Sequence, residues 1–432
     1  MSQGKIRTMS LYTATCLVVA NMVGVGVFTS VGYQIAGGLT PFVILILWLV
    51  GGVCAFCGGV AYAELAAALP RSGGEYHFLT RIFHPSVGFL AGWVSITAGF
   101  AAPVAVGAIA FGNYIHRIRP ALGALPLAFA ALVFITVVML VSATLRKWFQ
   151  NVSTSLSFLA ILVFLGIGFF APAHGSALVP QAGDTARLFS PGFATSLIYV
   201  MFAYAGWNAS TYVTAEVRNP SRNVPLSMAL GTVIVTVLYI AMNAIFLRAA
   251  PAAELSGQNE VGLIAGTHVF GATGGKWMAL LIAAGLLAHI GSMQWIGPRV
   301  TATMGEDTRV LRPFSIVNTG GIPIYATLAQ TAIAAFMLAT GSFKSVLTYV
   351  QFTITLCSAL VVIGVFVLRV REPNLPRPVR AWGYPVTPAI FLIVNGWMLW
   401  HVFAENPKES LAGLGTILSG LVVFYLSPKQ KK

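Results

Sequence analysis

Long apolar runs separated by short polar segments fill almost the whole chain. Each run has at least roughly 17 residues, which is enough to cross the hydrocarbon core of a bilayer as a helix. We therefore predict an all-α polytopic membrane protein with twelve transmembrane helices. The predicted spans cover about residues 9–37, 42–68, 87–114, 123–143, 151–171, 192–215, 226–248, 277–303, 323–340, 345–369, 385–403 and 410–426.

The first apolar run is interrupted near its middle. Gly24 and Gly26 lie two positions apart in the stretch Asn21–Thr29, and each glycine weakens a helix by roughly 1 kcal/mol. A broken helix is tolerated in a membrane only where its freed backbone groups find partners in the protein or in a watery cavity. The stretch therefore predicts a ligand site. The alternative is close helix packing, since glycine is common in membrane helices.

The sixth span carries a second interruption, where Gly206 lies beside Trp207 and Asn208. An amide is costly in lipid unless it is paired, so Asn208 is expected to face the protein interior. A matched pair of glycine-interrupted spans is typical of inverted-repeat transporters, although two packing glycines remain the alternative. The half-helix after Gly26 would offer N–H groups to a carboxylate, and the half-helix ending near 202–205 would offer carbonyls to an ammonium. A zwitterion fits such a site.

The two interrupted spans would occupy corresponding positions in two five-span halves of the chain. With the N-terminus in the cytoplasm, eighteen of the 25 Lys and Arg residues fall on inner segments and seven on outer ones, as the positive-inside rule expects. We therefore expect a bacterial cytoplasmic-membrane protein with both termini inside. The predicted parts are a cytoplasmic tail (1–8), the first repeat (9–171), the second repeat (192–369), a cytoplasmic basic loop (370–384), peripheral helices (385–426) and a cytoplasmic tail (427–432).

Composition supports a membrane protein and argues against other classes. Charged residues make up 8% of the chain, whereas soluble domains carry about 25%. The net charge of +14 comes from residues between the apolar runs, so no nucleic-acid partner is expected. All four cysteines lie inside apolar runs, and Cys54 and Cys57 have no second pair to complete a zinc site. We interpret them as packing residues.

Enzyme and channel classes lack the expected motifs. The chain has no HExxH and no GxSxG, and the segment 275–277 lacks the upstream Gly and the Ser/Thr of a phosphate loop. We therefore expect no catalytic residues, cofactor or metal. Channels also contain broken helices, but no filter-like or charged-ring sequence stands out.

Several short motifs accompany the two breaks, and none is specific by itself. They are Gly24–Phe28, Ala63–Leu65 with Pro70, Gly73–Tyr76, Phe202–Asn208, Glu216–Pro220 with Arg222 and Pro225, Gly297–Arg299, and Arg377–Pro378 with Gly383–Pro385. In this order and on this topology, the chain resembles the amino acid–polyamine–organocation superfamily, most closely its L-type amino acid transporter branch and bacterial relatives. The resemblance covers nearly the whole chain and implies a ten-helix inverted-repeat core, two peripheral helices, alternating access and an amino acid substrate.

The resemblance also implies where the substrate binds. In this family, backbone N–H groups of the first span hold the substrate carboxylate, and the positions that match are Val23, Gly24, Val25 and Gly26. Carbonyls of the first and sixth spans hold the amino group, and the positions that match are Met22, Phe202, Ala203 and Ala205. The aromatic that matches Phe202 acts as a gate over the substrate, and the amide that matches Asn208 lines the pocket.

Three features depart from the family pattern. The family often has a serine between the first-span glycines, whereas this chain has Val25, so a hydroxyl contact is lost and backbone binding is retained. Many relatives carry a fifth-span lysine that mimics a sodium ion, and the aligned residue here is Ser157. Eukaryotic members join a heavy subunit through a cysteine between the third and fourth spans. The segment His116–Pro126 has none, so no disulfide-linked heavy subunit is expected.

Four side chains are candidates for binding a coupling cation or a proton. Ser157 leaves a neutral, hydroxyl-lined space that suits a small hard cation, and Ser292 could lie within reach. His289 could couple transport to protons, unless it is a neutral hydrogen-bonded histidine. Tyr239 either reaches the first-span break or pairs structurally within its own helix. We interpret Glu64 as bonded to backbone or to the inner loops, and not as a proton carrier.

The sequence therefore predicts a secondary active transporter of neutral L-amino acids that works by alternating access in the lipid bilayer. The neutral class follows because no acidic or basic side chain is predicted in the pocket. The alternatives are an ion-independent amino acid exchanger, a carrier of polyamines or other organocations, and a channel.

Overall fold

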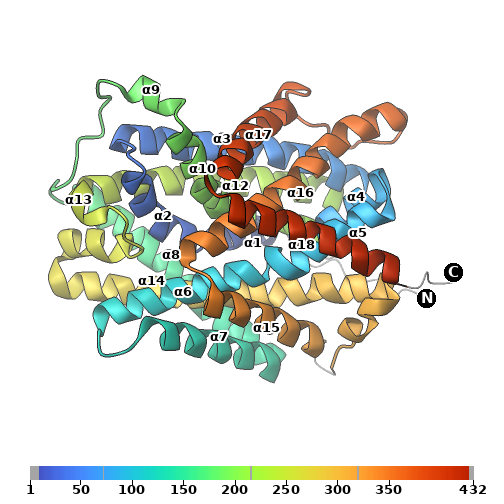
Figure 1. Ribbon diagram of the computed structural model, residues 1–432, viewed down its shortest axis with the longest axis horizontal. Helices are drawn as coiled ribbons and strands as arrows, with labels where there is room; N and C mark the ends of the chain where they lie inside the picture. The colour runs from blue at the N-terminus through green and yellow to red at the C-terminus, as the bar shows by residue number, and fades with distance from the viewer. Residues whose placement is uncertain (1–8, 72, 215–216, 319–320, 428–432) are drawn as a thin grey trace.

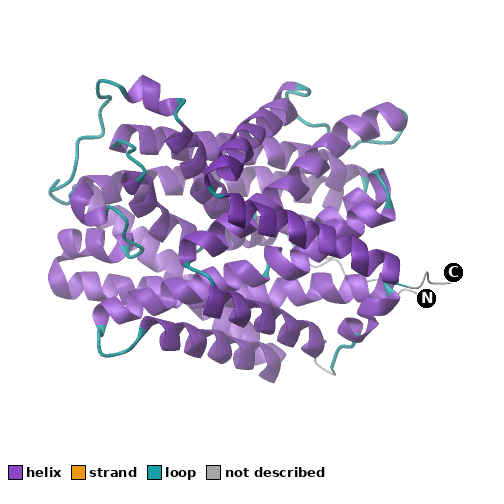
Figure 2. Ribbon diagram, in the orientation of Figure 1, coloured by secondary structure: helices purple, strands orange, loops and turns teal. Residues whose placement is uncertain are grey.

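The computed structural model of this protein describes residues 9–71, 73–214, 217–318 and 321–427. Within these ranges the regular elements are helices (Figure 2), together with one isolated bridge between Met9 and Val217. Ten helices are long and apolar enough to cross a membrane. Two shorter apolar helices, Pro191–Tyr204 and Ile324–Thr340, lie at the sixth and ninth predicted spans. The all-helical prediction is confirmed for the described residues, while the predicted tails at 1–8 and 428–432 lie outside them.

The helices follow the predicted spans closely. The first half of the chain contains α1 (Leu11–Met22), α2 (Val25–Ala36), α3 (Pro41–Ala68), α4 (Gly74–Ile82), α5 (Pro85–Val94), the π-helix η1 (Ser95–Gly99), α6 (Ala101–Ile118), α7 (Ala124–Val141), α8 (Ala143–Phe170), α9 (Asp184–Leu188), α10 (Pro191–Tyr204) and α11 (Ala209–Tyr212). The second half contains α12 (Pro220–Ala249), α13 (Ala252–Leu255), α14 (Val261–Asp307), the 3₁₀ helix η3 (Arg309–Ser315), α15 (Ile324–Thr340), α16 (Phe343–Arg371), α17 (Val386–Glu405) and α18 (Pro407–Leu426).

Two predicted helix starts are wrong. α8 begins at Ala143, eight residues before the predicted start at 151, because Ser142 caps its first turn by accepting a hydrogen bond from the N–H of Leu145. α14 begins at Val261 instead of 277, so a segment assigned to a loop is helical. Gly271 interrupts α14 with a φ of 74°, a conformation that glycine adopts without steric cost. The segment was assigned to a loop because it contains polar residues. A helical segment that does not cross the membrane can contain such residues.

The long helices pack side by side. α3 lies along α12, and α14 lies along both α6 and α8. Figure 1 shows α9 and α13 toward one end of the molecule, and α4 with the last turns of α18 toward the other. Segments that the charge count places on opposite sides of the membrane thus lie at opposite ends.

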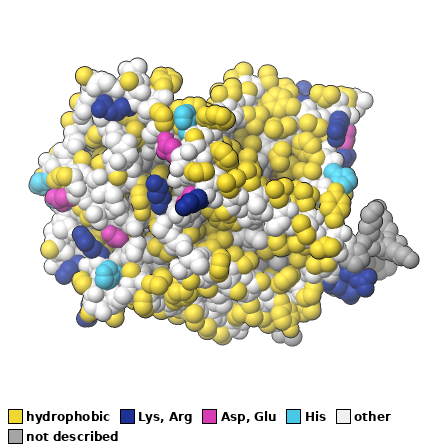
Figure 3. Space-filling view, viewed as in Figure 1, with side chains coloured by type: hydrophobic (Ala, Val, Ile, Leu, Met, Phe, Trp, Pro, Cys, Tyr) yellow, Lys and Arg dark blue, Asp and Glu magenta, His cyan; other side chains and the backbone are white. Residues whose placement is uncertain are grey.

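The outer surface of the helices is apolar. Large side chains such as Phe336 and Trp400 are 68% and 72% exposed, and Figure 3 shows hydrophobic side chains over much of the visible face. A contiguous apolar surface of this kind is unfavourable in water and is typical of a surface that contacts lipid.

A buried ion pair closes the bundle near the basic loop. The Glu64 carboxylate is 1% exposed and accepts two hydrogen bonds from Arg369, at 2.9 and 2.6 Å. Arg377 lies 3.3 Å from the same carboxylate, and the backbone N–H of Ala381 donates to it at 2.7 Å. The interpretation of Glu64 as bonded to the inner loop is therefore confirmed. This carboxylate ties α3 to α16 and to the loop before α17.

Replacing Glu64 tests this tie. Glu64→Gln leaves Arg369 and Arg377 without their carboxylate, and breaking a buried pair by removing one partner costs about 3–5 kcal/mol. We expect a large drop in the melting temperature of the purified protein in detergent. The matched control is Glu372→Gln, whose exposed pair with Arg81 is screened by water and whose loss should change the melting temperature little. Equal drops in the two variants would contradict this assignment.

Candidate substrate site

The interruption of the first span is confirmed, and it lies two residues earlier than predicted. α1 ends at Met22 and α2 begins at Val25, so Gly26 lies inside the first turn of α2 and not before it. The first N–H groups of a helix have no partner within the helix, and no side chain caps α2 at Gly24. The N–H groups of Val25 and Gly26 therefore present the positive end of the α2 dipole to an anion.

The two glycines of this break are required for space. A Cβ on Gly24 would lie 2.5 Å from Nδ1 of His289, and a Cβ on Gly26 would lie 2.6 Å from Cα of Ala203. Real Cβ atoms do not approach other atoms this closely. The φ of Gly24 is −144°, which any residue adopts, so close approach explains its presence and backbone angle does not. The packing role considered for these glycines is confirmed, and it coexists with a helix break.

The interruption of the sixth span is also confirmed. α10 ends at Tyr204 and α11 begins at Ala209. Between them Gly206 has a φ of 107°, a region that favours glycine. A Cβ on Gly206 would lie 2.9 Å from the carbonyl carbon and oxygen of Asn21. The two breaks therefore pack directly against each other, although 185 residues separate Asn21 from Gly206 in the sequence.

One side chain joins the two breaks. The Tyr239 hydroxyl on α12 lies 2.6 Å from the carbonyl oxygen of Met22 and 3.0 Å from that of Ala203. A hydroxyl carries one proton, so the two carbonyls share it. The ring is fully buried and packs edge-on against Trp48, with centroids 5.3 Å apart. Tyr239 thus reaches the first-span break, which was one of the two alternatives, and it acts there as a brace.

His289 lies beside the first break. Its ring is 7% exposed and packs between Gly24 and Gly107 of α6. Neither ring nitrogen has a hydrogen-bond partner within the described residues, so the hydrogen-bonded and the proton-binding interpretations of His289 both stay predictions. Buried polar groups are rarely left unpaired, because the loss costs about 1–3 kcal/mol. The imidazole lies against Gly24, at the N-terminus of α2.

The carbonyls predicted to hold an ammonium are partly engaged within the protein. Those of Met22 and Ala203 accept from Tyr239, and that of Phe202 accepts from the N–H of Ala205 at 3.0 Å. Each carbonyl oxygen has two lone pairs, so each retains capacity for a second donor. Val23 follows the last residue of α1, and its N–H donates to the carbonyl of Val19 at 2.9 Å.

Of the two serines proposed for ion coupling, one lies against α14 and the other lies on it. Ser157 on α8 packs against Gly285, which is about one turn before His289. Ser292 is buried on α14, three residues after His289. Gly285, His289 and Ser292 all lie on α14, so Ser157 contacts the helix that carries the other two candidates.

A small polar cavity adjoins the second break, and its volume is about 40 Å³. A water molecule occupies about 30 Å³ in the liquid, so this cavity accommodates roughly one water, and an amino acid would require it to open. The Asn208 amide faces this cavity and donates to the Tyr212 hydroxyl at 3.4 Å. Its other polar lining residues are Gln351, Thr355 and Ser358 of α16 and Asn395 of α17.

Asn395 is a residue that the sequence reasoning missed. It lies on α17, which the prediction treats as peripheral, yet it is 1% exposed and lines the cavity beside the second break. Its amide donates to the carbonyl of Phe391 at 2.8 Å and lies 3.1 Å from Sγ of Cys54. An amide in the middle of an apolar span is the same signal that identified Asn208, and it would have identified Asn395 as well.

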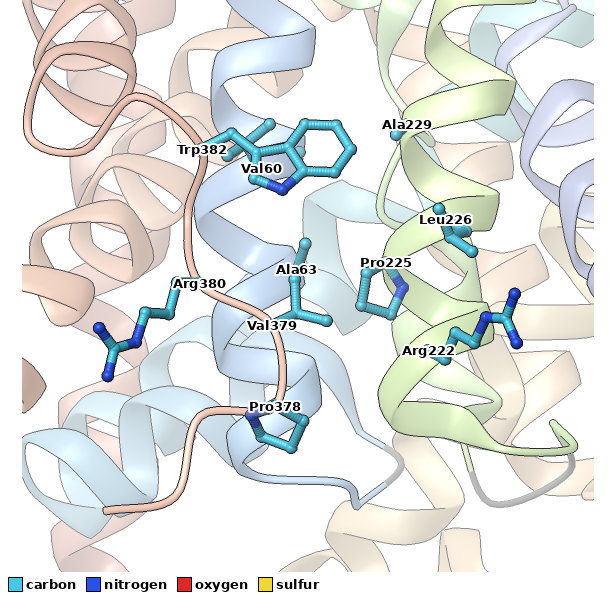
Figure 4. A pocket seen from close by; sticks show the side chains of 11 residues that line it. Val60, Ala63, Arg222, Pro225, Leu226, Ala229, Pro378, Val379, Arg380 and Trp382 are labelled. Atoms are coloured by element: carbon cyan, nitrogen blue, oxygen red, sulfur yellow. The ribbon is translucent and has the colours of Figure 1, made fainter. Parts of the chain in front are cut away.

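A larger pocket of about 340 Å³ lies away from the breaks, between α3, α12 and the basic loop. Its lining is mainly apolar, and Figure 4 shows the Trp382 ring near Val60 while the side chains of Arg222 and Arg380 extend away from each other. Polar groups do not converge in this pocket, so it is not suited to a zwitterion.

Within the described residues, no group of three or more His, Cys, Asp or Glu could hold a metal ion.

The close approach at Gly26 generates a test. Gly26→Ala places a methyl group against Ala203, and overpacking of this kind typically costs about 1–3 kcal/mol. We expect a lower melting temperature and weaker stabilisation by added L-leucine, because the two breaks are forced apart. The matched control is Gly166→Ala on α8, where a Cβ meets nothing within 4 Å. Full retention of ligand-induced stabilisation in Gly26→Ala would show that the contact between the breaks is unimportant.

The chain is similar in sequence to known proteins. A family model described as amino acid permease matches residues 9–424. The chain is 27% identical over 430 residues to the b(0,+)-type amino acid transporter 1 of Mus musculus, an alignment that covers 97% of this chain and 88% of that relative. It is 26% identical to the Asc-type amino acid transporter 1 of Mus musculus over 440 residues, covering 97% and 81%.

A third relative is the large neutral amino acids transporter small subunit 2 of Mus musculus, which is 26% identical over 432 residues and covers 97% of this chain and 81% of the relative. These relatives are transporters, so the expectation that the protein is not an enzyme is confirmed, as is its assignment to the membrane. The matches also confirm the resemblance carried by the sequence motifs. The chain therefore belongs to the amino acid permease family, in the L-type branch of the amino acid–polyamine–organocation superfamily.

Proposed function

We propose that this protein is a secondary active transporter of neutral L-amino acids that works by alternating access. The observation that carries this proposal is the Tyr239 hydroxyl, which holds the carbonyls of Met22 and Ala203 together at two facing helix breaks. Facing breaks place unpaired N–H groups and carbonyls at the middle of the membrane, where a ligand can use them. The names of the relatives, which are all amino acid transporters, support the same substrate class.

The polar groups at the breaks fit a zwitterion. The N–H groups of Val25 and Gly26 suit the substrate carboxylate, and His289 offers it a ring N–H from the adjacent helix. The free lone pairs of the carbonyls at Met22 and Ala203 suit the amino group. None of the contacts described above brings an Asp, Glu, Lys or Arg to the breaks, which favours a substrate with a neutral side chain.

The remaining parts of the site follow from their positions. Phe202, which is buried one residue before Ala203, serves as the apolar gate, and Asn208 lines the pocket. The twelve spans form a 5+5 inverted repeat with both termini in the cytoplasm of a bacterium. We expect no disulfide-linked heavy subunit, because the segment 116–126 contains no cysteine.

Coupling has three alternatives near the α8–α14 contact. A small cation can be held by the hydroxyls of Ser157 and Ser292, a proton can bind to His289, or the protein exchanges amino acids without an ion. Uptake into proteoliposomes, measured while sodium, potassium and pH gradients are varied one at a time, distinguishes these. Uptake that does not change with any of the three gradients, but depends on amino acid inside the proteoliposomes, indicates an ion-independent exchanger.

A thermal-shift panel tests the substrate class. Purified protein is heated with neutral, acidic and basic L-amino acids, with D-leucine and with spermidine. A ligand that binds only the folded state stabilises it by RT ln(1 + [L]/Kd), which is about 2.7 kcal/mol at a hundredfold excess over Kd. We expect saturable, stereoselective shifts with neutral L-amino acids. Shifts produced by spermidine alone would favour an organocation carrier and contradict the proposal.

The gate generates a further prediction. Phe202→Ala removes an apolar lid but no polar ligand group, so we expect the KM for uptake of the stabilising amino acid to rise at least tenfold. Truncating a buried Phe typically costs about 3–5 kcal/mol of stability, so folding is checked by gel filtration. Phe202→Leu is the control that keeps an apolar side chain at this position. Wild-type transport kinetics in folded Phe202→Ala would remove this residue from the site.

A further inference from the structure

Two carboxyl groups are buried on the α3–α16 side of the bundle, and their surroundings differ. Glu64 is held by Arg369 and Arg377. Glu75, in the first turn of α4, is 5% exposed and forms no ion pair within the described residues. Its partners are hydroxyl groups. The hydroxyl of Tyr62 donates to Oε1 at 2.6 Å, and that of Ser358 donates to the same oxygen at 3.1 Å.

The titratable side chains closest to Glu75 carry hydroxyl and thiol groups. They are the Tyr62 hydroxyl of α3, the Tyr212 hydroxyl of α11 and the Cys357 thiol of α16. Helix α5, which packs against α4, contains no charged residue. On α4 itself, Arg81 is paired with Glu372. His77, also on α4, has its pKa lowered to about 4 by burial and by the charges of Arg71 and Arg81, and Arg71 is paired with Asp307.

Burial has the largest effect on the pKa of the Glu75 carboxyl. Desolvation raises the pKa of Glu75 above its ordinary value, and the hydrogen bonds from Tyr62 and Ser358 offset this only in part. The arginines that would stabilise a buried carboxylate are present at Glu64 and absent here. Glu75 is therefore a carboxyl that can exchange a proton, whereas Glu64 is held in ion pairs with two arginines.

Glu75 is connected to the second helix break through side chains in contact. The Tyr62 ring packs edge-on against Trp207, with centroids 4.6 Å apart. A Cβ on Gly74 would lie 2.6 Å from the Tyr212 ring, and that tyrosine accepts from Asn208. Movement of the residues between α10 and α11 therefore changes the surroundings of this carboxyl.

We propose that Glu75 is the proton-binding residue of a proton-coupled amino acid transporter. This inference rests on the proposed function. The step is a simple titration, in which a carboxylate oxygen binds a proton from water on one side of the membrane and releases it on the other. The neutral form is compatible with the closed packing of α3, α4 and α16. The charged form requires water, so it favours a conformation in which this region opens.

Flux measurements in proteoliposomes test this role. Uptake of radiolabelled L-leucine and L-alanine is measured with and without an inward proton gradient, and leucine-for-leucine exchange is measured without a gradient. We expect the gradient to stimulate wild-type uptake severalfold. In Glu75→Gln, the ratio of gradient-driven uptake to exchange should fall to the value seen without a gradient. Glu75→Asp should retain the stimulation, and so should the exposed control Glu372→Gln.

The outcomes separate this inference from the proposed function. Equal stimulation of the wild type and Glu75→Gln overturns the role of Glu75. The role of Glu75 is also overturned if the wild type exchanges amino acids but its uptake does not respond to the gradient and does not make the medium alkaline. That result leaves amino acid transport itself intact. Absence of both uptake and exchange of any amino acid overturns the proposed function itself. If Glu75→Gln does not fold, the role of Glu75 is tested by two other measurements. These are the alkalinisation of the medium by the wild type and the ratio of gradient-driven uptake to exchange in Glu75→Asp.

A stability measurement gives a readout independent of transport. A raised pKa means that the stability contributed by the protonated form is present at low pH and lost as pH rises through the folded-state pKa of Glu75. The wild-type melting temperature should therefore fall relative to that of Glu75→Gln as pH increases. A constant difference between the two proteins across this range would show that Glu75 does not titrate there.

Discussion

The structure depends on how backbone groups are satisfied where no water is present. Ending a helix in the middle of a membrane leaves N–H and carbonyl groups without partners, and each costs several kcal/mol in hydrocarbon. This chain places its two helix ends against each other, with Gly206 on Asn21 and Gly26 on Ala203. Tyr239 then supplies one proton to two of the freed carbonyls. The groups that remain are those a zwitterion can use, so the same constraint shapes the fold and the site.

The same physics separates the two buried carboxyls. A charge removed from water requires a compensating charge or it becomes neutral. At Glu64 two arginines supply that charge, and the result is a tie between α3, α16 and the basic loop. At Glu75 hydroxyl groups are the partners, so the carboxyl retains the option of binding a proton. Two glutamates of similar burial therefore have a structural role in one case and a proposed transport role in the other.

Much of the architecture could be predicted because local patterns carry it. Apolar run length identified the spans, and Gly24, Gly26 and Gly206 located the two breaks to within two residues. The starts of α8 and α14 were missed because a capped turn and a polar helical segment look like loops when hydropathy is the signal. Asn395 was missed because its helix was expected to be peripheral, although a mid-span amide was itself a sufficient signal.

The sequence by itself determined the membrane environment, the helical class, the two interruptions and, through its motifs, the family. These depend on composition and on neighbours within about one turn, where hydrophobic burial and helix propensity act locally. Only the tertiary structure decided that Gly24 lies against His289, that Tyr239 bridges both breaks and that Glu75 forms no ion pair with the described residues. Those facts depend on which residues meet in the packed structure, such as Tyr239 with Met22 and Glu75 with Ser358, which lie 217 and 283 positions apart in the chain. The burial and pairing of a polar group are properties of these packed surroundings.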